Sequence, residues 1–233
     1  VQTAELAYYN KIEEQGLAIL TRKSEDYENL KTSHGTWKPA SINVIHALNK
    51  LVREPEVLKL HQGLLVEATF NNGTLWSNGQ IGLITELPDS TVLMNWKSFP
   101  MLLAPPGIRS LPSDTYSLES LKTFGWKVVN MKPAPDLVHH CQGGMFGKRY
   151  QYGIRSMAAT TIHKAMGNDY DTIVSSVCDD GINGFRLWEK AQVIVLLSRV
   201  HRAKDIIFVG NKLETAQKLL QLISLQPKYA LYM

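Results

Sequence analysis

Two polar blocks in the last third of the chain carry the side chains best suited to chemistry. The first, from Ala159 to Gly167, contains Thr161, His163 and Lys164 and leads into an apolar run at 172–177 that predicts a strand. A short helix followed by a buried strand presents its polar residues at the sheet edge, where α/β folds usually bind ligands. The alternative is a capped helix whose hydroxyl and imidazole groups only satisfy nearby backbone groups.

The second block joins a strongly apolar run, 193–197, to Ser198 and Arg199, with Arg202 close behind and a predicted strand at 206–210. A guanidinium stays charged and offers a planar fork of donors to phosphate oxygens, so an arginine here suits a phosphate site. The alternative is an arginine that caps the C-terminus of its own helix.

Three ordered segments, "TIHKAMG", "VLLSRV" and "DIIFVG", resemble the last characteristic blocks of the RecD-like superfamily 1 helicases. The preceding "IRSMAAT" resembles the apolar lead-in of the same family. The resemblance covers roughly Leu17 to Gly210 and is specific from about Ile154 onward. It implies that the first block (motif V) contacts single-stranded nucleic acid and that the second (motif VI) supplies an arginine finger to a triphosphate.

The match at motif V assigns nucleic-acid binding to Thr161, His163 and Lys164, and a place at the nucleotide site to Gly167. His163 could instead be a packed histidine that orients the loop. The family usually has glutamine before this glycine, whereas this chain has Met166, which cannot form the same hydrogen bonds. The resemblance therefore leaves the coupling between nucleic acid and nucleotide weak or rearranged.

At motif VI, Arg199 matches the family's finger and is the expected catalytic residue, with Arg202 as a second nucleotide-site candidate. The expected cofactor is ATP with Mg²⁺, shared with an N-terminal RecA-like domain. No segment of the chain matches the phosphate-binding pattern GxxxxGK[ST], so this chain alone is not expected to hydrolyse ATP. The start at Val1, without methionine, suggests a part of a longer protein.

Two other interpretations stay open at this point. The chain could be a degenerate helicase-like module that binds nucleic acid or a protein partner without catalysis, which Met166 favours. It could also be an α/β scaffold in which Arg199 lies in an internal salt bridge. Trp76 and Trp96 could stack on bases, but tryptophan in a strand-rich region is more often core.

Composition fits a water-soluble nucleic-acid-binding protein without demanding one. The 233 residues carry a net charge of +4, and the pI is about 8.9. With two cysteines, no CxxC pair, no signal peptide and no run of membrane-spanning length, an intracellular location, nuclear or cytoplasmic, is expected. The expected partner is single-stranded nucleic acid, DNA in preference to RNA, and no membrane.

Adjacent polar residues near the middle of the chain do not indicate a metal site. His139, His140 and Cys141 are consecutive, and consecutive ligands rarely point at one ion, so no metal is expected. The glycines and basic residues of 143–149 predict a flexible basic turn.

The pattern of apolar residues predicts an α/β fold with a small barrel or meander of short strands in its middle part. The resemblance to RecD-like helicases implies that these are a RecA-like parallel-sheet domain and an inserted small β-barrel of the Src-homology-3 type. The expected parts are 1–55 and 150–233 for the RecA-like domain and 56–149 for the insertion. Asn-Gly and Pro-Asp pairs between apolar runs predict hairpin turns in the insertion. Helices are expected at 4–15, 25–31, 42–52 and 211–225, strands at 17–21, 57–60, 64–70, 80–87, 91–96 and 126–131, and an irregular segment at 100–125.

Overall fold

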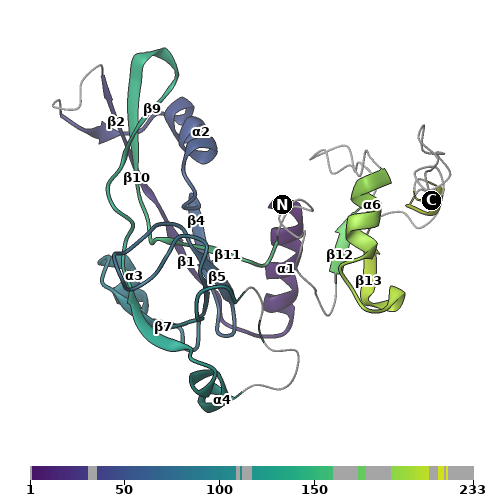
Figure 1. The fold of residues 1–233 in the computed structure, drawn as a ribbon. Coiled ribbons are helices and arrows are strands. Elements are labelled where there is room, and N and C mark those ends of the chain that lie inside the picture. The colour runs from purple at the N-terminus through teal and green to yellow at the C-terminus, as the bar shows by residue number, and fades with distance from the viewer. Residues whose placement is uncertain are drawn as a thin grey trace. The chain divides into compact units, whose positions relative to one another are not determined.

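The computed structural model describes residues 2–30, 36–108, 111, 117–159, 173–176, 190–209, 215–217 and 219. The chain divides into two compact units, one formed by Tyr9–Ala158 and the other by Val1–Tyr8 with Ala159–Met233. Figure 1 shows the elements of both units. No helix among the described residues is both long and apolar enough to cross a membrane.

A five-stranded antiparallel sheet forms the larger part of the first unit, in the order β11-β5-β6-β7-β8. Its strands are β5 (Leu65–Ala68), β6 (Ile81–Leu83), β7 (Phe99–Leu103), β8 (Lys127–Met131) and β11 (Ile154–Ser156). Leu83, Leu102 and Trp126 pack with Leu121 of α4 (Leu118–Thr123) in a buried cluster. The capping box of Ser117 and Ser120 fixes the start of that helix.

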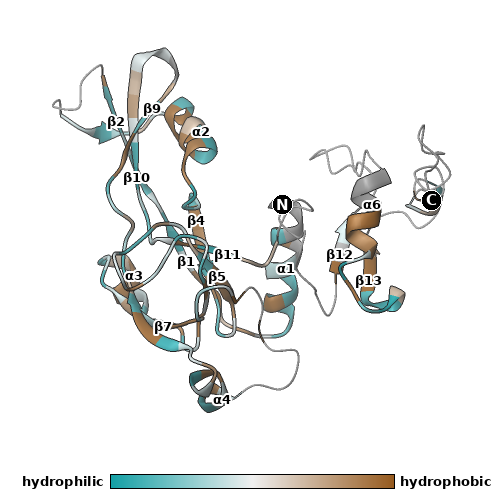
Figure 2. Ribbon diagram, viewed as in Figure 1, coloured by the Kyte–Doolittle hydropathy of each residue, from teal (hydrophilic) through white to brown (hydrophobic). Residues whose placement is uncertain are grey.

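A second antiparallel sheet has the order β3-β2-β10-β9 and is covered on one face by α2 (Ile42–Leu51). Its strands are β2 (Glu25–Leu30), β3 (Lys38–Pro39), β9 (Val138–His140) and β10 (Met145–Tyr150). Val44 and Leu48 of α2 lie so close to Gly147 that an added Cβ would sit 2.8 Å and 3.2 Å from their side chains. Glycine at this position therefore lets the helix approach the sheet. In Figure 2, α2 has one hydrophobic and one hydrophilic side.

Shorter elements complete this unit. β1 (Leu20–Lys23) pairs antiparallel with β4 (Val57–Leu60), and the hydroxyl of Tyr9 in α1 (Gln2–Glu14) donates to the carbonyl of Lys59, 3.0 Å away. α3 (Ser90–Met94) begins at Asp89, whose carboxylate accepts from the Thr91 amide at 2.7 Å.

In the other unit, the described strands β12 (Ile173–Ser176) and β13 (Ile206–Val209) pair in parallel, with Ile173 opposite Ile206. The apolar helix α6 (Lys190–Leu197) and the 3-10 turn η2 (Ala203–Asp205) precede β13. Because the strands run in the same direction, η2 enters the pair at the edge where β12 also begins.

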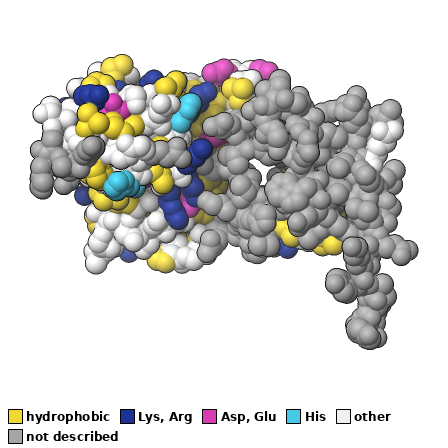
Figure 3. Space-filling view, turned by 90° about the horizontal axis from the view of Figure 1, so that it is seen from above, with side chains coloured by type: hydrophobic (Ala, Val, Ile, Leu, Met, Phe, Trp, Pro, Cys, Tyr) yellow, Lys and Arg dark blue, Asp and Glu magenta, His cyan; other side chains and the backbone are white. Residues whose placement is uncertain are grey.

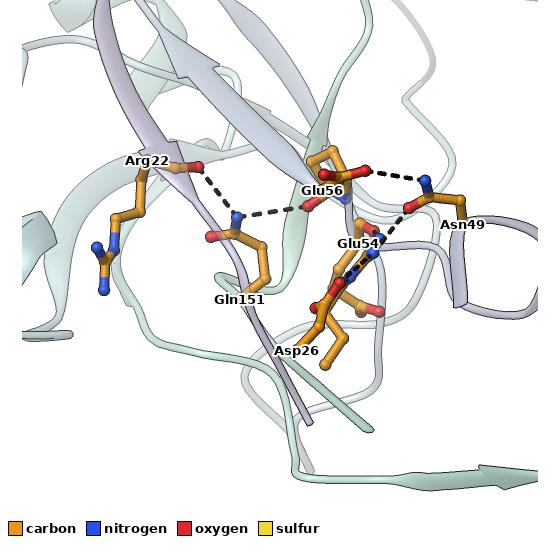
Figure 4. A network of polar contacts seen from close by, with 8 residues as sticks. Arg22, Asp26, Asn49, Glu54, Glu56 and Gln151 are labelled. Carbon is orange, nitrogen blue, oxygen red and sulfur yellow. Dashed lines mark hydrogen bonds and ion pairs between the residues drawn. The ribbon is translucent and has the colours of Figure 1, made fainter. Parts of the chain in front are cut away.

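A buried polar network holds the second sheet to its surroundings (Figure 4). Arg149 of β10 donates to both carboxylate oxygens of Asp26 in β2, from Nε at 2.8 Å and from Nη2 at 2.6 Å. Its Nη1 donates to the carbonyl of Glu54 at 3.0 Å, and its Nη2 also donates to Asn49 of α2 at 2.7 Å. The side chains of Arg149 and Asp26 are 1% and 5% exposed, so this pair lies out of water.

Several sequence predictions hold in the structure. The expected helices at 4–15 and 42–52 are confirmed as α1 and α2, and the expected strands at 57–60 and 126–131 as β4 and β8. The strands expected at 172–177 and 206–210 are confirmed as β12 and β13. The expected helix at 211–225 lies mostly outside the described residues.

Other predictions were wrong for identifiable reasons. The helix expected at 25–31 is strand β2, because pairing with β10 and the Asp26 ion pair outweigh local helix propensity. The strand expected at 91–96 contains helix α3, which the Asp89 cap starts. The segment 100–125, expected to be irregular, contains most of β7 and all of α4, and the flexible turn expected at 143–149 is mostly β10.

A mixed α/β fold is confirmed, although every described strand pair except β12–β13 is antiparallel. β1 pairs with β4, β2 with β10, and β11 with β5, so strands of the expected parts 1–55, 56–149 and 150–233 pair across those boundaries. The three-part division, the RecA-like sheet and the inserted barrel stay predictions.

The buried ion pair generates a stability prediction. Asp26→Ala should lower the free energy of unfolding by about 3–5 kcal/mol, because it leaves the Arg149 guanidinium buried without its counterion. Glu67→Ala is the matched control, since Glu67 pairs with Arg155 at 2.5 Å but the two side chains are 21% and 25% exposed. The control should cost about 1 kcal/mol or less. Equal losses in urea unfolding would contradict the special role of the buried pair.

Candidate functional site

The residues predicted to bind nucleic acid, Thr161, His163 and Lys164, lie outside the described residues, as do Gly167 and Met166. Their roles therefore stay predictions.

Arg199 is described and half-buried, just beyond the end of α6. Its Nε and Nη2 donate to the hydroxyl of Ser198 at 3.3 Å and 3.1 Å, and that hydroxyl donates to the carbonyl of Val195 at 3.0 Å. This chain of bonds orients the guanidinium against the last turn of α6. A cation at a helix C-terminus is also favoured by the helix dipole, so the capping alternative and the finger share this geometry.

Arg202 is exposed and stands immediately before η2, where its carbonyl accepts from the Asp205 amide at 3.0 Å. Arg199 and Arg202 thus lie on one short segment that leads into β13. The structure places both predicted nucleotide-site cations on the approach to one sheet edge.

The two tryptophans considered for base stacking are both engaged elsewhere. Trp76 is 3% exposed and packs edge-on against Phe70, with ring centroids 5.6 Å apart. Trp96 is half-buried beneath the guanidinium of Arg22, whose Cζ lies 4.0 Å from the ring centroid. Tyr152 lies against the same indole at 5.4 Å. Neither tryptophan offers a free face to a base.

Trp96 occupies an unusual backbone position. Its φ is +54°, the left-handed region that glycine usually fills at the end of a helix. The amides of Trp96 and Lys97 donate back to the carbonyls of Leu93 and Val92, at 3.2 Å and 2.9 Å, as in a Schellman motif. This conformation costs roughly 1–3 kcal/mol, and the contacts of the indole must offset that cost.

Those contacts centre on Glu25. The Trp96 indole N–H donates to one carboxylate oxygen at 2.9 Å, and the Tyr27 hydroxyl donates to the other at 2.9 Å. Arg22 forms an ion pair with the same carboxylate at 2.9 Å. The indole hydrogen bond is the largest of the effects that lower the pKa of Glu25 below its usual range, ahead of Tyr27 and Arg22.

Nearby, burial raises the pKa of Tyr152 to about 12. The Tyr152 hydroxyl donates to the carbonyl of Val92 in α3 at 3.2 Å and to that of Lys97, just beyond the helix, at 2.8 Å, so α3 is tied to the β10–β11 link. This cluster is a structural junction that holds β1, β2 and α3 together.

No group of three His, Cys, Asp or Glu side chains among the described residues could hold a metal ion. His139 and His140 are consecutive in β9, so their side chains point to opposite faces of the strand. Cys141 is buried against Val44 and Leu48.

Charge on the described surface is mixed. On the face drawn in Figure 3, Lys and Arg side chains lie beside acidic and hydrophobic ones rather than in one basic field. The ion pairs Arg22–Glu25 and Lys148–Asp136 illustrate this arrangement. A site for a polyanion on these residues must therefore use more than a block of positive charge.

Comparison with solved structures shows which known folds the chain resembles. Pif1 helicase from Candida albicans matches 95% of this chain and 47% of its own length, with a TM-score of 0.57 and 17% identity. The chain has a helicase-like fold. Bacteroides Pif1 bound to ssDNA matches 88% of this chain and 38% of its own, with a TM-score of 0.45 and 18% identity. Pif1 from Bacteroides in complex with ADP-AlF3 and ssDNA matches 90% of this chain and 38% of its own length, with a TM-score of 0.47 and 17% identity.

No protein-family model matches the chain, and no curated protein matches it by sequence. The chain spans about half the length of the Candida helicase that it resembles. A likeness at this identity establishes the fold alone.

Sequence reasoning missed one group of half-buried side chains. Phe146, Lys148 and Tyr150 alternate along β10. The three glycines of 143–149 led to the prediction of a turn in place of this strand. The period-two pattern in "MFGKRYQY" was the signal that could have revealed a strand with one aromatic, basic face.

The Glu25 cluster generates a prediction about pKa. Trp96→Phe keeps an aromatic ring but removes the indole N–H, so the pKa of Glu25 should rise toward the ordinary glutamate value. An NMR titration of the Glu25 carboxyl carbon measures this change. Tyr27→Phe is the control and should raise the pKa less, because its hydroxyl contributes less. An unchanged titration in Trp96→Phe would show that another group sets the pKa.

Proposed function

We propose that the chain is the C-terminal motor half of an ATP-dependent superfamily 1 helicase that binds single-stranded nucleic acid. The observation that carries the proposal is the fold likeness to the Candida Pif1 helicase, which extends over 95% of this chain with a TM-score of 0.57. The order of the blocks "TIHKAMG", "VLLSRV" and "DIIFVG" supports it independently. In this proposal, the RecA-like domain comprises 1–55 and 150–233, and 56–149 is the inserted barrel-like region.

Nucleic-acid binding is assigned to Thr161, His163 and Lys164. The threonine hydroxyl contacts a phosphate, and the lysine ammonium adds a point charge that attracts the phosphate backbone whatever the base sequence. The partner is single-stranded nucleic acid, DNA in preference to RNA.

The nucleotide role is assigned to Arg199 as the finger, with Arg202 and Gly167 beside it. ATP with Mg²⁺ supplies the phosphoryl group whose hydrolysis drives a helicase, and an N-terminal RecA-like domain would hold its Walker lysine. The donors on this chain suit phosphate, since Arg199 and Arg202 stand on one segment and Ser198 orients the Arg199 guanidinium. Arg199 would stabilise negative charge that grows only in the transition state.

A second candidate is a helicase-like module that binds nucleic acid or a protein partner without catalysis. Met166, which replaces the hydrogen-bonding glutamine of the family, favours this alternative. A purified full-length protein that binds single strands but hydrolyses no ATP would select it.

The nucleic-acid function predicts salt-sensitive binding to single strands. Fluorescence anisotropy with a labelled oligonucleotide should show affinity falling as salt rises, because bound cations release counterions. Lys164→Ala should reduce the salt slope by about one phosphate contact, whereas Lys122→Ala, on α4, should leave it unchanged. Absence of binding at low salt would contradict the proposed function.

If Arg199 is catalytic, its substitution should lower ATPase activity without lowering stability. The test uses the protein that includes the N-terminal motor domain. Arg199→Ala should lower kcat by about a thousandfold or more while ATP affinity and folding stay nearly intact. Arg199→Lys should restore little, because an ammonium lacks the two-pronged geometry. Steady-state ATPase and thermal unfolding on one preparation measure both effects. A variant destabilised by about 1 kcal/mol with normal kcat would identify Arg199 as a structural cap instead.

A further inference from the structure

The sheet β3-β2-β10-β9 has two unlike faces. On one face, the Arg149 side chain of β10 points toward α2 and the buried network, and α2 packs against Gly147. Side chains alternate along a strand, so Phe146, Lys148 and Tyr150 point to the opposite face. Among the described elements, α2 is the helix that packs on this sheet, and it covers only the first face.

Neighbouring strands extend the second face. Tyr27 of β2 lies opposite Lys148, and Pro39 of β3 lies opposite Tyr27. On the other side, His140 of β9 lies opposite Phe146, and their ring centroids are 4.4 Å apart. We name the face formed by Tyr27, Trp37, His140, Phe146, Lys148 and Tyr150 the aromatic face.

Lys148 lies at the centre of the aromatic face. Its Nζ is 4.7 Å from the ring centroid of Trp37 and 5.7 Å from that of Tyr27. The same ammonium forms an ion pair with Asp136 at 2.5 Å, and the Asp136 side chain is 48% exposed. The Lys148 ammonium therefore lies between two aromatic rings, and its charge is neutralised by a carboxylate that is partly exposed to solvent.

The rings remain partly accessible. Tyr27, Trp37, Phe146 and Tyr150 are half-buried, and His140 is exposed. Phe146 and Tyr150 stand four residues apart on β10, roughly 13 Å at the usual rise of a strand, so the rings of this face are spaced widely enough to meet different bases. Tyr150 packs edge-on against Trp96, with ring centroids 4.7 Å apart, and the Tyr27 hydroxyl is bound to Glu25. Trp37, Phe146 and His140 therefore form the part of the face that lies away from the Glu25 cluster.

We propose that the aromatic face is a stacking surface for single-stranded nucleic acid, with Lys148 as its phosphate contact. This inference rests on the proposed function and adds the binding surface to it. Aromatic side chains on an open sheet stack with bases of any sequence, and a nearby cation follows the backbone. A phosphate that reaches Lys148 displaces Asp136, so binding exchanges one anionic partner for another.

Anisotropy titration of the 233-residue chain with labelled oligothymidylate tests the surface. Trp37→Leu and Phe146→Leu retain apolar bulk but remove the π-face, and each should weaken binding about tenfold, within the range for base–aromatic stacking. Phe124→Leu is the matched control, because Phe124 is 66% exposed at the end of α4, away from this sheet. It should bind like the unmodified chain.

Asp136→Asn gives a result that a purely structural ion pair would not. Removing the competing carboxylate frees the Lys148 ammonium, so affinity at low salt should increase and the salt slope should steepen by about one contact. Trp37→Tyr, which keeps a ring, should retain most of the binding even if Trp37→Leu loses stability in thermal unfolding.

The outcomes separate this inference from the proposed function. If the unmodified chain binds but Trp37→Leu and Phe146→Leu bind equally well, the aromatic face is wrong and the proposed function stands. Weaker binding by Asp136→Asn would also overturn the role of Lys148. If the unmodified chain does not bind at low salt, both proposals fail.

Discussion

The bidentate ion pair between Arg149 and Asp26 is the interaction on which the second sheet depends. It joins residues 123 positions apart in sequence and lies almost entirely out of water. Two buried charges cost several kcal/mol each to desolvate, so the pair is tolerable only when its remaining donors are also satisfied. Glu54 and Asn49 accept those donors, and they come from the link before β4 and from α2. One guanidinium therefore holds two strands, a helix and a connecting segment in a single arrangement.

The same pair sets the register of β2 against β10. Register decides which side chains face which side of a sheet, and a shift of one residue would exchange the two sets. With Asp26 opposite Arg149, their neighbours Tyr27 and Lys148 must lie together on the far side. The buried network and the aromatic face are thus two consequences of one alignment. A residue that touches no ligand can position a binding surface in this way.

Local patterns predicted those elements whose stability is local. The helix at 42–52 has an amphipathic sequence, and the strand at 57–60 lies between clear turn signals, so both were predictable. Strand β2 was not, because "EDYENL" contains three acidic groups and follows a serine that resembles a helix cap. Its conformation depends on a partner strand far along the chain. The backbone at Trp96 was hidden for the same reason, since tryptophan is unfavourable there without Arg22, Glu25 and Tyr152 around it.

The candidate functional residues likewise fall into two groups: those that local sequence motifs predict, and those that only contacts between distant segments bring together. Motif order predicts Arg199 and Arg202 as nucleotide-site residues, and both lie on the segment before β13. The aromatic face could not be recognised from order, because Tyr27, Trp37 and Lys148 come from three separate segments. Its chemistry is also invisible to net charge, since Asp136 cancels the Lys148 ammonium. When a cation already has an anionic partner, exchange for a phosphate gains little Coulomb energy, and stacking must supply most of the affinity. A mildly basic chain with internally paired cations is therefore compatible with nucleic-acid binding, provided that its aromatic side chains stay accessible.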